Sequence, residues 1–126
     1  MLKLNTSKCK VISIGRNLDK SYTYDLRRNN YTISLERIDQ MRDLGILIDE
    51  RLAFCNHIQD KINKAYAMLG VIKRNFKYLQ LSSFILLYKN MARSHLDYCS
   101  SVCTPYRTGD IEDLEKVQKK GNWTTA

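Results

Sequence analysis

Two pairs of neighbouring carboxylates, Asp49-Glu50 and Glu112-Asp113, are the first candidates for chemistry in this 126-residue sequence. Metal-dependent catalysis needs carboxylates that converge on a shared ion. The first pair is expected in a turn between a strand and a helix, and the second in the first turn of a helix, so neither is placed to share an ion. The five glycines are dispersed, which excludes a glycine-rich phosphate-binding loop. We therefore interpret both pairs as solvated surface groups.

A second candidate is a zinc site on one face of a helix. His95, Cys99 and Cys103 lie at i, i+4 and i+8, and a fourth ligand could come from His57 or Cys55. Structural zinc sites, however, usually take their ligands from a knuckle and a second element. Cys99 also lies on an apolar stripe, where a free cysteine behaves as a small hydrophobic residue. The sequence therefore predicts no metal site and no cofactor in this chain.

The charge distribution indicates a polyanionic partner. The 21 Lys and Arg residues exceed the 13 Asp and Glu residues, which gives a formal net charge of +8 and a pI near 9.4. Residues 61–96 contain no acid, and neither do residues 1–18. The longer stretch carries these cations: Lys61, Lys64, Lys73, Arg74, Lys77, Lys89 and Arg93. This pattern favours a nucleic acid partner, and the alternative is a soluble protein that is simply basic. Tyr66, Tyr78 and Tyr88 offer rings either for stacking on bases or for the core.

Composition argues against a membrane or secreted protein. A hydrophobic fraction of 44% with 27% charged residues is ordinary for a globular chain. Mean hydropathy is -0.42, and the longest apolar run, residues 84–88, is too short to cross a bilayer. The first residues lack the apolar segment of a secretory signal, and the scattered cysteines are expected to be reduced. We expect an intracellular protein, nuclear or cytoplasmic, with no membrane partner.

The first part of the chain has the pattern of strands. Residues 10–14 form a short β-rich run, and residues 22–26 and 31–35 alternate large and polar side chains on either side of Asn29-Asn30. Asparagine tolerates the left-handed conformation of a tight turn, so the two arms predict a hairpin. A further strand is expected over residues 44–48, with Gly45 marking a bulge or a close backbone approach.

After residue 53 the hydrophobic period becomes helical. The first helix carries an apolar stripe at three- and four-residue spacing, made of Ile58, Ile62, Ala65, Tyr66, Leu69, Ile72 and Phe76. A second helix is expected from Ser82 or Ser83 until Pro105 ends it, and a third from Thr108 to Lys120. The fold class is therefore α+β: a small antiparallel β lobe over residues 1–53, a three-helix bundle over 54–120 and an irregular tail over 121–126.

Five blocks of the sequence resemble, in the right order, the reverse transcriptases of non-LTR (LINE-type) retrotransposons. The blocks are LNTSKCKV at 4–11, RDLGILID at 42–49, the first helix at 54–76 ending AMLGVIKRNF, LYK at 87–89 with SHLDYCSSV at 94–102, and IEDLEKVQKK at 111–120. In that family they correspond to the stretch after the catalytic motif, the Leu-Gly hairpin called the primer grip, and three thumb helices. The resemblance covers nearly the whole chain and implies a C-terminal palm-and-thumb fragment.

The resemblance assigns roles to matching positions. It implies that Lys8 acts near the departing pyrophosphate and that Leu44, Gly45 and Ile46 hold the primer 3′ end. It also implies that the thumb helices clamp an RNA/DNA template–primer duplex, which is the partner that the acid-free stretch favours independently. The remaining partner would be the missing palm and fingers of the complete RNA-directed DNA polymerase.

The sequence departs from the family where the catalytic metal is held. Such enzymes take aspartates from a Tyr-x-Asp-Asp hairpin and from further upstream to hold two Mg²⁺ ions, and all of these precede the residues present here. Cys103 stands where the family commonly has tryptophan, and the resemblance stops at Gly121. We therefore expect this chain alone to add no nucleotides and to bind no small-molecule substrate. The alternatives are a stand-alone nucleic-acid-binding module and a non-functional retroelement remnant.

Overall fold

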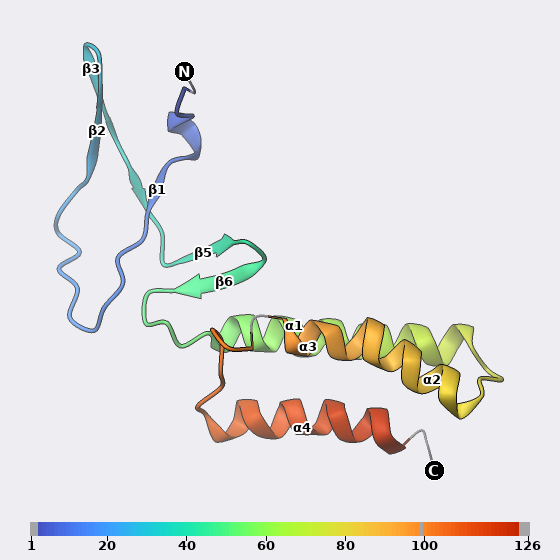
Figure 1. Cartoon of the computed structure of the whole chain (residues 1–126). Coiled ribbons are helices and arrows are strands. Elements are labelled where there is room, and N and C mark those ends of the chain that lie inside the picture. Colours follow the sequence, from blue (N-terminus) through green and yellow to red (C-terminus); the bar gives the residue numbers. More distant parts are fainter. Residues whose placement is uncertain (1–2, 99, 124–126) are drawn as a thin grey trace. The chain divides into compact units, whose positions relative to one another are not determined.

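The chain folds as two units in the computed structural model, which describes residues 3–98 and 100–123. The first unit, Met1–Ala53, holds the strands, and the second, Phe54–Ala126, holds the long helices (Figure 1). The unit boundary falls where the hydrophobic period changes from that of a strand to that of a helix. The fold is thus α+β, with small antiparallel sheets followed by helices.

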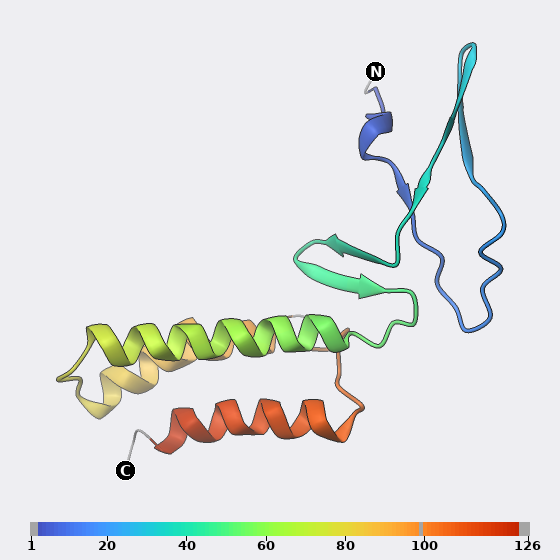
Figure 2. The ribbon, with the colours of Figure 1, turned by 180° about the vertical axis from the view of Figure 1, so that it is seen from behind.

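The first unit contains a short 3₁₀ helix, η1 (Thr6–Lys8), and strands that pair two by two (Figures 1 and 2). The strands are β1 (Lys10–Val11), β2 (Asp25–Arg28), β3 (Tyr31–Ser34), β4 (Glu36–Arg37), β5 (Gln40–Asp43) and β6 (Ile46–Asp49). β2–β3 and β5–β6 are antiparallel hairpins, whereas β1 and β4 are parallel. The expectation of a wholly antiparallel lobe is therefore wrong at this pair, which lies far apart in sequence and is not joined by a turn.

The β2–β3 hairpin forms around Asn29-Asn30, as the sequence predicts. Asn29 has a positive φ of 48°, and Arg28 lies opposite Tyr31 in the register. The ladder continues by one hydrogen bond, which the Leu35 amide donates to the Tyr24 carbonyl at 2.8 Å. Asn29 thus helps to set the register, because an asparagine tolerates the left-handed backbone of a tight turn.

Two other strand predictions need correction. Leu44 and Gly45 form a turn rather than a strand, with φ of 49° and 78°, and β6 begins after them at Ile46. The preceding strand, β5, was implied by the family resemblance but not by hydrophobic alternation, because its residues QMRD show little of the apolar pattern of a strand. β1 ends at Val11 instead of continuing to residue 14, since its pairing partner β4 is only two residues long.

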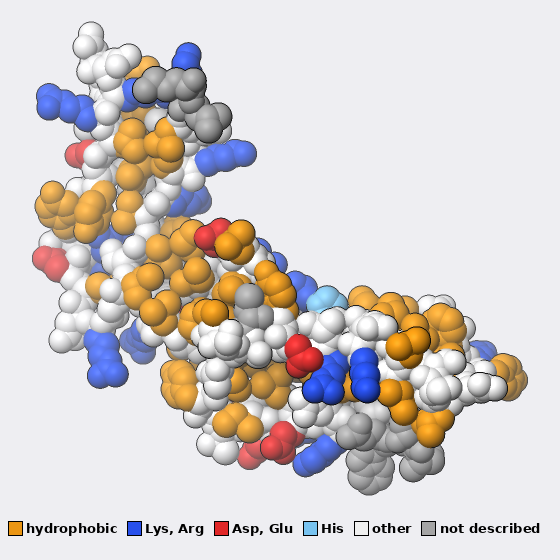
Figure 3. Space-filling model, in the orientation of Figure 1, with side chains coloured by type: hydrophobic (Ala, Val, Ile, Leu, Met, Phe, Trp, Pro, Cys, Tyr) orange, Lys and Arg blue, Asp and Glu red, His pale blue; other side chains and the backbone are white. Residues whose placement is uncertain are grey.

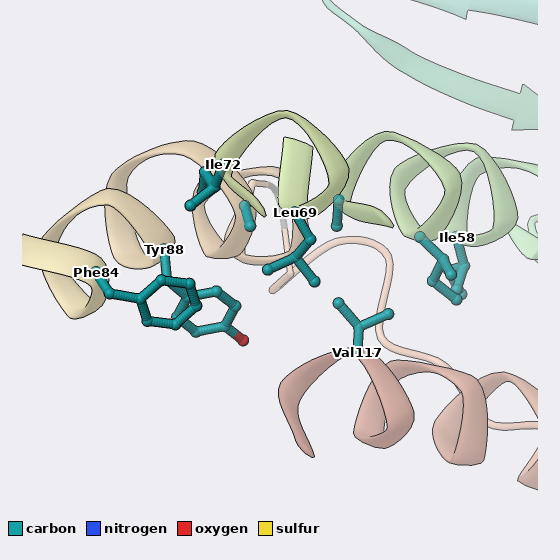
Figure 4. Close-up of a cluster of buried hydrophobic side chains, with 9 residues drawn as sticks. Ile58, Leu69, Ile72, Phe84, Tyr88 and Val117 are labelled. Atoms are coloured by element: carbon teal, nitrogen blue, oxygen red, sulfur yellow. The ribbon is translucent and has the colours of Figure 1, made fainter. Parts of the chain in front are cut away.

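The second unit is built from three helical segments. α1 (Cys55–Asn75) is followed by α2 (Leu81–Leu87), the π-helical turn η2 (Tyr88–Arg93) and α3 (Ser94–Asp97), which run on without a break, and then by α4 (Thr108–Trp123). Their buried cluster (Figure 4) consists of Ile58, Ile62, Ala65, Leu69, Ile72, Phe84, Tyr88, Ala92 and Val117. The predicted stripe of α1 supplies five of these residues, and burial of each large aliphatic side chain contributes about 1.5–3 kcal/mol.

The ends of the second and third helical segments differ from expectation. The second begins at Leu81 rather than at a serine cap and ends at Asp97, because Tyr98 adopts an extended conformation (φ -61°, ψ 120°). The apolar periodicity therefore continues past the end of the helix. α4 extends to Trp123, so Gly121 belongs to the helix and not to an irregular tail.

Burial is confined to the helical unit. Every described residue between positions 3 and 53 is exposed or only half-buried, whereas Ile62, Ile72 and Val117 are almost fully buried. The β unit therefore has no apolar core of its own among these residues. Across the described part of the chain, no helix combines the length and apolar character that a bilayer crossing requires.

Candidate nucleic-acid interface

Four cations of the acid-free stretch are exposed and uncommitted. Lys73 and Arg74 lie in the last turn of α1, Lys77 in the following turn and Lys89 in η2. Within residues 3–98 and 100–123, none of the four has an ion-pair, hydrogen-bond or ring partner. Their charges are therefore available to an external anion, and the nearest sequence neighbours offer no acid to neutralise them.

The other three predicted cations are already engaged within the helical unit. The Lys64 ammonium lies 2.9 Å from Asp60, and the Arg93 guanidinium lies 3.2 Å from Asp97. The Lys61 ammonium lies over the ring of Tyr98, 5.0 Å from its centroid. The Arg93–Asp97 pair has the i, i+4 spacing of a helical ion pair. The ring contact of Lys61 cannot be predicted from spacing, because it depends on the chain leaving the helix at Tyr98.

The seven predicted cations do not lie on one helix. Four of them lie in α1, Lys77 lies in the turn after it, and Lys89 and Arg93 lie in η2. Within α1, Lys61 and Lys73 are twelve residues apart, which is about 18 Å along the helix. Lys73 and Lys77 do not form an i, i+4 helical pair, because α1 ends at Asn75. The structure instead gathers Lys73, Arg74 and Lys77 at the carboxyl end of α1.

The outward face of α1 carries amides, a feature that the charge analysis missed. Asn56, Gln59 and Asn63 are exposed at three- and four-residue spacing, and Arg74 continues the same row. The Gln59 amide donates to the Asn63 side-chain oxygen at 3.4 Å. Amide side chains can donate to phosphate oxygens without adding charge, so this row extends the polar surface along α1.

The three tyrosines of the stretch have different environments. Tyr88 belongs to the core, and burial raises the pKa of its hydroxyl above the ordinary value near 10. Tyr66 is half-buried beneath the Lys120 ammonium, which lies 4.8 Å from its ring centroid. Tyr78 lies in the turn after α1 and is 100% exposed. Of these three rings, Tyr78 is therefore the one whose two faces are both open to a ligand.

The predicted primer-grip residues form the tip of the β5–β6 hairpin. Leu44 has a φ of 49° and is 82% exposed, Gly45 has a φ of 78°, and Ile46 begins β6. A positive φ costs a non-glycine residue about 1–2 kcal/mol. An exposed leucine in that conformation therefore lowers the stability of the turn. Backbone strain of this kind is typical of positions that contact a ligand.

Lys8 lies at the end of η1 beside an open pocket of the β unit. The helix is capped by Asn5, whose side chain accepts a hydrogen bond from the Ser7 amide at 3.2 Å. The pocket has a volume of about 400 Å³ and is lined by Lys8, Lys10, Ile12, Ile38, Gln40, Met41 and Arg42. Lys10 is held by Glu36 at 3.0 Å, whereas the Lys8 side chain is exposed at the same pocket.

Among the described residues, no three His, Cys, Asp or Glu side chains cluster as a metal site would require, although His57 and Cys103 line the same pocket. His95 lies in α3, Cys103 lies beyond the end of that helix, and Cys99 falls outside the described residues.

Three of the four paired carboxylates contact a backbone amide or a lysine within their own unit. Asp49 accepts a hydrogen bond from the Ala53 amide at 2.9 Å, and Glu50 contacts the Lys20 ammonium at 3.1 Å. Asp113 binds Lys116 at 2.9 Å, and this hydrogen bond raises the pKa of the lysine above its ordinary value. These contacts are those of surface carboxylates that stabilise turns and helix faces.

Comparison with protein-family models, with curated proteins and with solved structures finds no match to this chain.

Proposed function

We propose that this chain is a palm-and-thumb portion of a LINE-type retrotransposon reverse transcriptase that holds the template–primer duplex. The sequence blocks suggest the family, and the presence of a β5–β6 hairpin and of a separate helical unit supports a distinct role for each. In this account the helical unit binds the sugar–phosphate backbone and the β5–β6 hairpin contacts the primer end.

The observation that carries the proposal is the group of uncommitted cations: Lys73, Arg74, Lys77 and Lys89. Lys73, Arg74 and Lys77 are like charges close together in the sequence, and like charges repel one another. A phosphate backbone converts this repulsion into attraction and releases the counterions condensed on the nucleic acid. The ion pairs at Lys64 and Arg93 show that the chain neutralises other cations, so leaving these four unneutralised favours an external polyanion.

The β5–β6 hairpin supports the second half of the proposal. Its tip presents an exposed Leu44 on a left-handed backbone. An apolar side chain in this position can pack against the sugar or base of a primer terminus. That contact would offset the energetic cost of the left-handed backbone at Leu44.

The described residues do not fit the two Mg²⁺ ions of a complete polymerase. Asp49, Glu50 and Asp113 are tied to amide or lysine partners, and no cluster of three ligands forms in the described part of the chain. The role proposed for this chain is therefore to bind and position the nucleic acid rather than to hold the catalytic ions.

A stand-alone nucleic-acid-binding module is the second candidate. It is favoured by the apolar core of the helical unit, which is assembled entirely from residues of that unit. The reading frame upstream of the chain distinguishes the two candidates, since a Tyr-x-Asp-Asp motif there supports the polymerase and its absence supports the module.

The proposal is tested by measuring binding of the full chain to a labelled RNA/DNA duplex at several salt concentrations. Four phosphate contacts predict a slope of log Kd against log salt of about 3–4. No binding at low salt, or binding with a flat slope, would contradict the proposal and favour a non-functional remnant.

A further inference from the structure

The turn that joins α1 to α2 exposes an aromatic ring completely. We call residues 73–81, from the last turn of α1 to the first residue of α2, the α1–α2 tip. Tyr78 lies in the middle of this tip with its side chain 100% exposed. Because this ring is not buried in the core, both of its faces are open to a ligand.

Two partly exposed apolar residues flank Tyr78 in the sequence of the tip. Phe76 is 45% exposed and Leu81 is 51% exposed. The space-filling view shows hydrophobic side chains gathered at the end of the helical unit where α1 meets α2, with Lys or Arg side chains beside them (Figure 3). Tyr78 is therefore part of a mixed apolar and cationic surface.

The charge of the tip is entirely positive. Lys73 and Arg74 close α1, where cations are favoured by the partial negative charge of the helix end. Lys77 lies beyond the helix and is not explained in this way. With no acid from residue 61 to residue 96, the tip complements a polyanion.

We propose that the α1–α2 tip binds an unpaired nucleotide, with the base stacked on Tyr78 and the flanking phosphates held by Lys73, Arg74 and Lys77. This deepens the function proposed above and depends on it. A base inside a duplex has its faces covered by its neighbours, whereas a base in a single-stranded overhang offers a free face to the ring. The chain therefore prefers a duplex with a single-stranded end to a blunt duplex.

The degree of exposure of the apolar side chains favours a nucleotide over a lipid surface. Both partners are anionic, so charge does not separate them. The purely apolar side chains of the tip, Phe76 and Leu81, are about half covered, whereas a tip that inserts into a bilayer is expected to expose them more fully.

The test compares three forms of the full chain by fluorescence anisotropy with a blunt duplex and with the same duplex carrying a short overhang. The unmodified chain is expected to bind the overhang duplex about tenfold more tightly. Tyr78→Ala is expected to abolish this preference and leave affinity for the blunt duplex unchanged, whereas Tyr78→Phe, which keeps the ring, retains it. Because Tyr78 has no core contacts, circular dichroism is expected to show the same helix content in all three forms.

Tyr106→Ala is the matched control, since Tyr106 is also exposed in the helical unit but lies outside the tip. A preference that survives Tyr78→Ala, or that Tyr106→Ala removes equally, overturns the inference. Equal binding of both duplexes overturns the inference alone, whereas failure to bind either duplex overturns the proposed function as well. Vesicles of phosphatidylserine and phosphatidylcholine that bind in a Tyr78-dependent way, without an overhang preference, would assign the tip to membranes.

Discussion

Gly121 lies in α4 where the helix backbone passes close to the ring of Tyr88. A Cβ atom at this position would overlap the ring of Tyr88, which is only 8% exposed and packed in the core. Gly121→Ala is therefore expected to lower the free energy of unfolding by about 1–3 kcal/mol, the usual cost of overpacking. Thermal unfolding followed by circular dichroism measures the change.

Gly70 provides the matched control for Gly121. It lies inside α1, and a Cβ there would meet nothing within 4 Å. Gly70→Ala is expected to raise stability by about 0.5–1 kcal/mol, because alanine loses less backbone entropy in a helix. Equal effects of the two substitutions would contradict the close packing of α4 on Tyr88.

Tyr88 also makes the stability of the helical unit depend on pH in the alkaline range. Burial raises the pKa of its hydroxyl, so the unfolded chain loses this proton before the folded chain does. Stability therefore falls as pH rises above about 10, the ordinary tyrosine pKa. In urea titrations at about pH 8 and about pH 11, the unmodified chain is expected to lose more stability than Tyr88→Phe. An identical loss in the two forms would show that Tyr88 is accessible to solvent.

At the scale of elements, the β5–β6 hairpin carries strain that a substitution can release. Leu44→Asn places a residue that tolerates positive φ at the tip. We expect the hairpin to gain about 0.5–1 kcal/mol, measured as slower amide exchange in β6. Affinity for a duplex with a recessed 3′ end is expected to fall about fivefold, because the apolar contact is lost.

Leu52→Asn separates strain from binding in this experiment. Leu52 also has a positive φ, of 52°, but it follows β6 and lies outside the tip. We expect this substitution to slow amide exchange without changing affinity. If both variants bind the recessed duplex as the unmodified chain does, Leu44 has no part in holding the primer.

Elements with strong local patterns were predictable, and elements defined by distant contacts were not. The stripe from Ile58 to Ile72 identified α1 and its buried face, and Asn29-Asn30 identified the β2–β3 turn. The parallel pairing of β1 with β4 depends on residues more than twenty positions apart, which no local pattern reveals. The end of α3 at Asp97 was missed because apolar spacing continued beyond it.

The candidate site was predictable in composition but not in arrangement. The acid-free stretch identified the cations, yet which of them are free depends on partners such as Asp60 and Tyr98 that only the fold brings close. The role of Leu44-Gly45 as a turn was implied by the family resemblance, whereas hydrophobic alternation alone predicted a strand there.

At the scale of the whole molecule, the two units differ in how they are stabilised. The buried cluster is formed by residues 58–117, whereas described residues 3–53 contribute no buried side chain. We therefore expect residues 54–126, expressed alone, to show the same cooperative helical unfolding in urea as the full chain. Amides of the β unit are expected to exchange much faster than those of α1. An unfolded fragment would show that the helical unit needs the β unit.

The most direct test of the account is the salt dependence of duplex binding in two charge variants of the full chain. One variant combines Lys73→Gln, Arg74→Gln and Lys77→Gln, and the other combines Lys10→Gln, Lys116→Gln and Lys119→Gln, which remove lysines already held in ion pairs. Both lower the net charge equally. The first is predicted to reduce the slope of log Kd against log salt by about 2–3 and the second to leave it nearly unchanged. Equal reductions would contradict the account, because binding would then follow net charge and not the uncommitted cations at the end of α1.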